Sequence, residues 1–169
     1  PGETVTVSPS WRNDTGAPQA ATGSASAFTG PGNPNPTYTI TDAAANYGTV
    51  AAGATASCTG TSNCYGLALG TPTTRPTLHW DGSVLETLSG GETKTWTLHV
   101  GNSFTDVPTS NGFYRFVETL LHKGVTGGCG VDTYCPATAT TREQMAVFVL
   151  VAKEGAGYTP PACAPPNTF

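Results

Sequence analysis

The sequence predicts a protein of two parts, a mainly β N-terminal sandwich followed by a small helical module. Three observations lead to this fold class. Residues 1–101 alternate polar with apolar side chains, as half-buried strands do. The residues that follow carry apolar side chains at helical spacing instead. Four of the five cysteines form two local pairs, one pair in each part.

Strands are expected throughout residues 1–101. The period-two alternation is clearest in three segments, Thr4–Ser8, Thr37–Thr41 and Thr95–Val100. Further strands are expected at Thr22–Thr29, Ala54–Cys58, Tyr65–Leu69 and Thr77–Trp80. Turn-forming residues separate them, at Asn13–Gly16, Gly30–Pro34, Asp81–Gly82 and Ser89–Gly91. About seven short strands in about 100 residues favour an immunoglobulin-like sandwich, with an incomplete sandwich that takes a strand from a neighbour as the alternative.

Two helices joined by a loop are expected in residues 102–155. Apolar residues of the first helix recur at helical spacing up to a stop at Gly124: Phe113, Phe116, Val117, Leu120 and Leu121. Thr141 is the expected N-cap of the second helix, with Gln144 as its capping-box partner. The apolar stripe of that helix is Met145, Phe148, Val149 and Ala152. Residues 156–169 are expected to be a linker or the start of a next repeat.

The cysteine spacing predicts two disulfides. Cys58 and Cys64 flank the segment TGTSN, and Cys129 and Cys135 flank GVDTY, both of which contain turn formers. Short loops between paired cysteines are typical of an oxidising compartment. The fifth cysteine, Cys163, is left for an intermolecular bond or a partner in a next repeat. A zinc site made of His122 and the cysteines at 129, 135 and 163 is disfavoured, because no C-x-x-C or H-x-x-x-H spacing occurs.

Composition excludes several function classes. Only 11% of the residues are charged and the net charge is -4, so the surface repels its own copies weakly. The seven basic residues are dispersed, which argues against a nucleic-acid partner. No apolar run approaches the roughly 20 residues that a membrane span needs.

Landmarks of the second part carry a family resemblance. They are Phe104-Thr-Asp106-Val-Pro108, a helix, Gly124-Val-Thr-Gly-Gly, Tyr134-Cys-Pro136 and Thr141-Arg142-Glu-Gln-Met-Ala-Val-Phe148. The segment Phe104–Lys153 resembles the S-layer homology (SLH) domain, in a variant with paired cysteines. The segment Val5–Gly16, which closes in Trp-Arg-Asn-Asp-Thr-Gly, resembles the opening of bacterial surface immunoglobulin-like modules. The final Asn-Thr-Phe169 repeats Asn-Ser-Phe104, as the start of another SLH repeat would.

The resemblance implies several roles. Asp106, Pro108, Gly124, Tyr134 and Pro136 would be structural motif residues. SLH modules hold secreted proteins on the cell envelope by binding wall polysaccharide, and the arginine of their T-R motif contacts the glycan. That arginine corresponds to Arg142, which makes Arg142 the candidate glycan-binding residue. The alternative for Arg142 is a structural pair with Glu118 or Glu143.

Catalytic and metal sites have little support. His79, His99 and His122 are dispersed in the sequence, and no hydrolase motif occurs. Asp132 is a candidate calcium ligand, but calcium needs six to eight oxygens and one carboxylate lies nearby. Trp11, Trp80 and Trp96 are expected to be core residues rather than a sugar-stacking platform. Asn13 begins a glycosylation sequon. We expect no enzyme activity, cofactor or metal.

These observations favour a secreted bacterial protein, extracellular or on the cell surface, that acts as a structural building block. Its partners would be copies of itself or adjacent SLH repeats, with cell-wall polysaccharide as a further candidate. The chain would then be a unit of a surface layer or filament. The alternative is a C-terminal accessory region that anchors a secreted hydrolase, such as a protease, to envelope glycan.

Overall fold

The structure is a computed structural model that describes residues 1–162. It divides the chain into two compact units, Pro1–Val100 and Gly101–Phe169. Strands hold 35% of the residues and helices 16%. The predicted fold class, mainly β with a small helical part, is confirmed.

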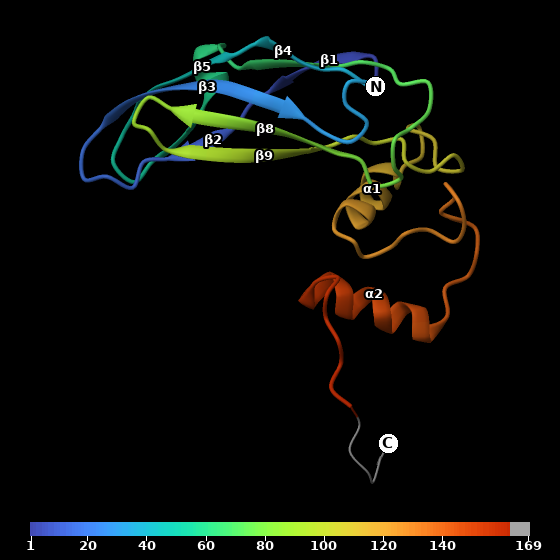
Figure 1. Ribbon diagram of the computed structural model, residues 1–169. Helices are drawn as coiled ribbons and strands as arrows, with labels where there is room; N and C mark the ends of the chain where they lie inside the picture. Colours follow the sequence, from blue (N-terminus) through green and yellow to red (C-terminus); the bar gives the residue numbers. More distant parts are fainter. Residues whose placement is uncertain (163–169) are drawn as a thin grey trace. The chain divides into compact units, whose positions relative to one another are not determined.

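The first unit is built from antiparallel strands. A four-stranded sheet has the order β5-β3-β8-β9, a three-stranded sheet the order β1-β7-β4, and β2 pairs with β6 (Figure 1). The strands, with the short 3-10 helix η1, are β1 (Glu3–Val7), β2 (Ser10–Arg12), β3 (Gln19–Thr29), β4 (Tyr38–Asp42), β5 (Ala44–Val50), β6 (Thr55–Ser57), η1 (Cys58–Thr61), β7 (Tyr65–Leu69), β8 (Asp81–Leu88) and β9 (Thr93–His99).

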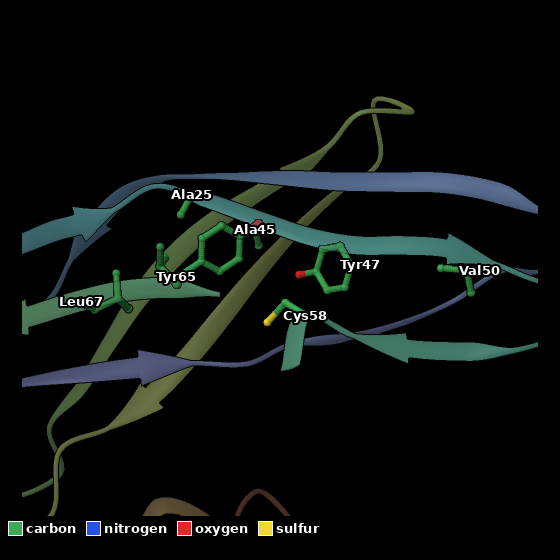
Figure 2. Packing of buried hydrophobic residues seen from close by; sticks show 8 residues of the cluster. Ala25, Ala45, Tyr47, Val50, Cys58, Tyr65 and Leu67 are labelled. Atoms are coloured by element: carbon green, nitrogen blue, oxygen red, sulfur yellow. The ribbon is translucent and has the colours of Figure 1, made fainter. Parts of the chain in front are cut away.

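The core of this unit lies between the sheets. Figure 2 shows Tyr65 and Leu67 of β7 among Ala45, Tyr47 and other buried residues of the facing sheet. Side chains from both sheets therefore share one apolar layer, as in a β-sandwich. The Cys58–Cys64 disulfide closes the loop of η1 against this layer, and Cys58 is fully buried.

A carboxylate is buried within the same layer. Glu86 of β8 is 0% exposed. Its Oε2 accepts hydrogen bonds from the indole N–H groups of Trp11, at 3.0 Å, and Trp96, at 2.6 Å. Its Oε1 accepts from the hydroxyl of Tyr65, at 2.6 Å, and from that of Tyr47. Four donors from four other strands thus replace the water that the carboxylate loses on burial.

Neighbouring residues keep the hydrogen-bond donors of Glu86 protonated and leave space for its side chain. Burial, followed by the hydrogen bond and charge of Glu86, raises the pKa of both Tyr47 and Tyr65 above the ordinary 10.0. Both phenols therefore stay protonated and able to donate. A β-carbon at Gly23 of β3 would lie 2.0 Å from the Tyr65 hydroxyl and 2.6 Å from Glu86 Oε1. Only glycine leaves room for the cluster at this position.

Some strands differ from the sequence prediction. Thr77–Trp80 was expected to be a strand and is not, because Arg75 donates hydrogen bonds to the carbonyls of Thr77 and Leu78. Asp81–Gly82 was expected to be a turn but begins β8. The glycine is needed for packing there, since a β-carbon at Gly82 would lie 3.1 Å from the Phe28 ring. Strands β2, β5 and β8 were missed.

The described part of the second unit contains two helices, α1 (Tyr114–His122) and α2 (Arg142–Glu154). Helix α1 buries Val117 and Leu121 and ends before Gly124, which adopts a φ of 67°. The N-cap predicted for α2 is confirmed. Thr141 accepts from the Gln144 amide, and the Gln144 side chain accepts from the Thr141 amide.

The Glu86 cluster predicts a graded loss of stability. Glu86→Ala leaves two buried and two partly buried donors without an acceptor, so the free energy of unfolding should fall by about 3 kcal/mol or more. Tyr47→Phe removes one donor and should cost about 1–2 kcal/mol. The exposed Glu92→Ala is the control, expected to change stability by less than about 0.5 kcal/mol. Urea unfolding of each variant measures these changes, and equal stability of Glu86→Ala and Glu92→Ala would refute the role of the cluster.

Candidate functional site

Two segments of the second unit, Phe104–Asp106 and Tyr134–Cys135, meet at a disulfide-closed loop. Cys129 and Cys135 form the second predicted disulfide. Asp106 accepts hydrogen bonds from the amide of Tyr134, at 2.8 Å, and from that of Cys135, at 2.7 Å. The Tyr134 ring lies 5.4 Å from that of Phe104, which is buried. Asp106 therefore fastens the end of the loop to the segment that precedes α1.

The hydrogen bonds to Asp106 also favour the ionised form of its carboxyl group. The backbone amide of Tyr134, followed by that of Cys135, lowers the pKa of this carboxyl below its ordinary value of 3.8, despite some loss of solvation. Asp106 is exposed and no ion pair is needed to explain the shift. Its role is that of a loop anchor.

The remaining motif residues lie in turns. The Pro108 carbonyl accepts from the Asn111 amide, at 2.8 Å, in the turn before α1. The Gly124 amide donates to the Leu121 carbonyl, at 2.9 Å, where α1 ends. Pro136 is exposed and directly follows the disulfide. These positions are consistent with structural roles.

Arg142 is the first residue of α2 and is exposed. Neither ion pair considered from sequence is present among residues 1–162. Glu118 is buried, and its carboxylate accepts hydrogen bonds from the amide and the hydroxyl of Ser103. The Arg142 guanidinium is therefore displayed at the start of the helix.

Helix α2 presents apolar side chains to solvent. None of its residues is buried. Four large apolar side chains are exposed, namely Met145 (50%), Val147 (56%), Val149 (57%) and Leu150 (36%). We call these four residues the α2 apolar surface. Several large apolar side chains grouped on one exposed helix are typical of an interaction surface, whereas single exposed apolar residues occur on any protein.

A cluster of possible metal ligands lies in the first unit. Asp81 of β8 is paired in register with His99 of β9. Asp81 Oδ1 lies 2.9 Å from His99 Nδ1, and Asp81 Oδ2 lies 3.0 Å from His79 Nε2. The two imidazole rings are 5.7 Å apart. His79 and His99 are dispersed in the sequence, but the β8–β9 pairing brings these distant positions together, so their spacing concealed the cluster.

A signal for this cluster was present in the sequence. Counting outward from the turn at Ser89–Gly91 pairs Thr87 with Thr93 and, six residues further along each strand, Asp81 with His99. His79 precedes Asp81 by two residues, which places the two side chains on the same face if the chain is extended. The assumption of a turn at Asp81–Gly82 concealed this register.

Other candidates have structural roles. Trp80 is fully buried. Trp11 and Trp96 are partly buried, pack against the core and donate hydrogen bonds to Glu86, so all three have structural roles. Asn13 is a poor glycosylation acceptor because it is buried and both its amide hydrogens are donated, to the carbonyls of Ala17 and Val50.

Within residues 1–162, neither of the metal sites considered from sequence, the cysteine-based zinc site and the calcium site at Asp132, is supported. The alternative zinc site is wrong, because the sulfurs of Cys129 and Cys135 are bonded to each other. Within residues 1–162, Asp132 belongs to no group of three potential metal ligands. Cys163, and the final Asn-Thr-Phe169, lie outside the described residues.

Comparisons with known proteins do not add to these observations. No protein family, no curated protein and no solved structure matches the chain. Neither helix in the described part of the chain has the length and apolar character that crossing a bilayer requires.

The anchoring role of Asp106 leads to a prediction for the loop. In Asp106→Ala, the amides of Tyr134 and Cys135 lose their acceptor and should exchange with solvent deuterium about 10-fold faster or more. Because the folded pKa is lowered, the contribution is present above the ordinary value of 3.8 and is lost as the pH falls through the folded pKa. Amide exchange by NMR measures both effects. The control is Asp132→Asn, which neutralises an exposed carboxylate within the loop itself and keeps a residue that tolerates the positive φ of 51° at this position. It should leave both amides unchanged.

Proposed function

We propose that the chain is a non-enzymatic structural module of an extracellular assembly and that it associates with copies of itself. The observation that carries the proposal is the α2 apolar surface. The helix begins at a complete capping box, so it is a well-formed element with a fixed start.

The distribution of apolar residues around α2 supports association. Met145 and Val149 are four residues apart and share one side of the helix. Val147 and Leu150 are three residues apart and share another side. A helix with apolar residues on more than one side is typical of a buried position, whereas a surface helix carries a single apolar stripe. Helix α2 therefore has the composition of a helix that is covered in its working state.

The charge and the disulfides fit this role. A net charge of -4 with 11% charged residues gives weak repulsion between copies. The Cys58–Cys64 and Cys129–Cys135 disulfides are typical of an oxidising, extracellular setting. Together with a sandwich whose sheets are open at their edges, these features describe a rigid building block.

Substitution of the α2 apolar surface should weaken self-association. Val147→Glu places a charge where a partner would exclude water, so the dissociation constant of the oligomer should rise about 10-fold or more. Analytical ultracentrifugation over a range of concentrations, with and without reductant, measures it. Thr109→Glu adds the same charge at an exposed turn and should behave as the parent protein. A parent protein that stays monomeric at every concentration, under both conditions, would refute the proposal.

A second candidate function rests on Arg142. Its exposed guanidinium has the paired N–H groups that suit a carboxylate-bearing or otherwise anionic glycan. In this case the chain would be the accessory region of a secreted hydrolase and would anchor it to the envelope. The SLH resemblance supports this reading.

Retention on purified cell wall tests the second function. Arg142→Ala should reduce the retained fraction about 10-fold, because a charge-assisted bidentate contact is lost. Arg115→Ala, which removes the other exposed arginine of the second unit, serves as the matched control. Equal retention of the two variants and the parent would exclude Arg142 as the glycan contact.

A further inference from the structure

The first unit contains a set of side chains that the proposed function does not use. His79, Asp81 and His99 are only partly exposed, at 41%, 28% and 15% of their side-chain areas. Both imidazoles direct a ring nitrogen at the same carboxylate. The ligand atoms of the three residues all lie within 4.8 Å of one another.

We propose that His79, Asp81 and His99 form a binding site for a divalent transition-metal ion of the zinc class. In a tetrahedral zinc site, with bonds of about 2.0–2.1 Å, neighbouring ligand atoms are about 3.3 Å apart. The separations of 2.9 and 3.0 Å from the two imidazole nitrogens to the Asp81 oxygens are close to that value. Small side-chain rotations would therefore open the cluster enough to admit an ion.

The backbone around the cluster is held in place. Asp81 and His99 are directly opposite each other at the end of the β8–β9 ladder. The ladder continues beyond them, because the Val100 amide donates to the Trp80 carbonyl at 2.8 Å. Arg75 donates to the carbonyls of Leu78, at 3.2 Å, and Val100, at 2.6 Å, which holds the residue that precedes His79 and the residue that follows His99. Ligands carried on such a fixed backbone lose little entropy when they bind an ion.

The ligand types determine the class of metal. Two imidazoles and a carboxylate suit zinc, cobalt, nickel or copper, whereas calcium and magnesium prefer oxygen ligands alone. To bind, His79 would use the lone pair of Nε2 and His99 that of Nδ1, so each neutral ring would carry its proton on the opposite nitrogen. The competing explanation is a metal-free hydrogen-bonded clasp between the two histidines and Asp81.

Metal titration distinguishes the two explanations. The protein is the untagged full chain with Cys163→Ser, because the two disulfides leave this residue as the remaining cysteine that could bind zinc. Calorimetric titration with zinc should show saturable binding to the folded protein, and the thermal midpoint should rise with zinc concentration. Cobalt, titrated separately, should give visible absorption bands of a low-symmetry site. Calcium at the same concentration should show no saturable binding and should leave the thermal midpoint unchanged.

Single substitutions then assign the ligands. Asp81→Asn and His79→Ala should each raise the zinc dissociation constant at least about 10-fold. The variant Asp14→Asn makes the same chemical change as Asp81→Asn elsewhere in the unit and should bind zinc as the parent does. Circular dichroism of the metal-free variants establishes whether each is folded. If Asp81→Asn does not fold, His79→Ala still tests the site, because His79 is exposed and its loss should leave the fold intact. The absence of saturable zinc binding, or equal binding by His79→Ala and the parent, would overturn the proposal.

Discussion

The structure of the first unit depends on the burial of one carboxylate. Transfer of a charge from water to a protein interior costs several kcal/mol unless hydrogen bonds replace its hydration. Glu86 recovers these bonds from two tryptophans and two tyrosines, and the nearest to it in the chain, Trp96, is 10 residues away. Because every donor lies on a different strand, the carboxylate is satisfied in a single arrangement of the sheets. The cluster therefore selects that arrangement as well as stabilising it.

The second unit is organised by local interactions instead. A capping box, a disulfide and one anchored carboxylate define its loop and the start of α2, and each acts over a short stretch of chain or on a single loop. Within the described residues, by contrast, none of the side chains of α2 is buried. In the building block that we propose, the sandwich would supply rigidity and the helical unit would supply the apolar contact between copies.

Sequence reasoning succeeded where the determining interactions are local. The cysteine spacing, the Thr141–Gln144 capping box and the stop at Gly124 each involve a few neighbouring residues, and all three are present in the structure. It failed for β8, because Gly82 has the composition of a turn but serves to admit the Phe28 ring. It also missed the Glu86 cluster, since Trp11 and Glu86 are 75 residues apart and no local pattern links them. The metal-ligand cluster lies between these two cases. It is not visible as a local motif, but the pairing of Asp81 with His99 could have been predicted from the register of the β8–β9 hairpin.

The placement of the tryptophans determines what optical methods can detect. The chain has three tryptophans, and all of them lie in the sandwich, two with their indole N–H groups on the same carboxylate. Intrinsic tryptophan emission therefore originates in the sandwich, and two of its three sources report on the Glu86 environment. Far-ultraviolet circular dichroism at 222 nm detects mainly the two helices, both of which belong to the other unit. The two signals together separate the melting of one half of the molecule from that of the other without any added label.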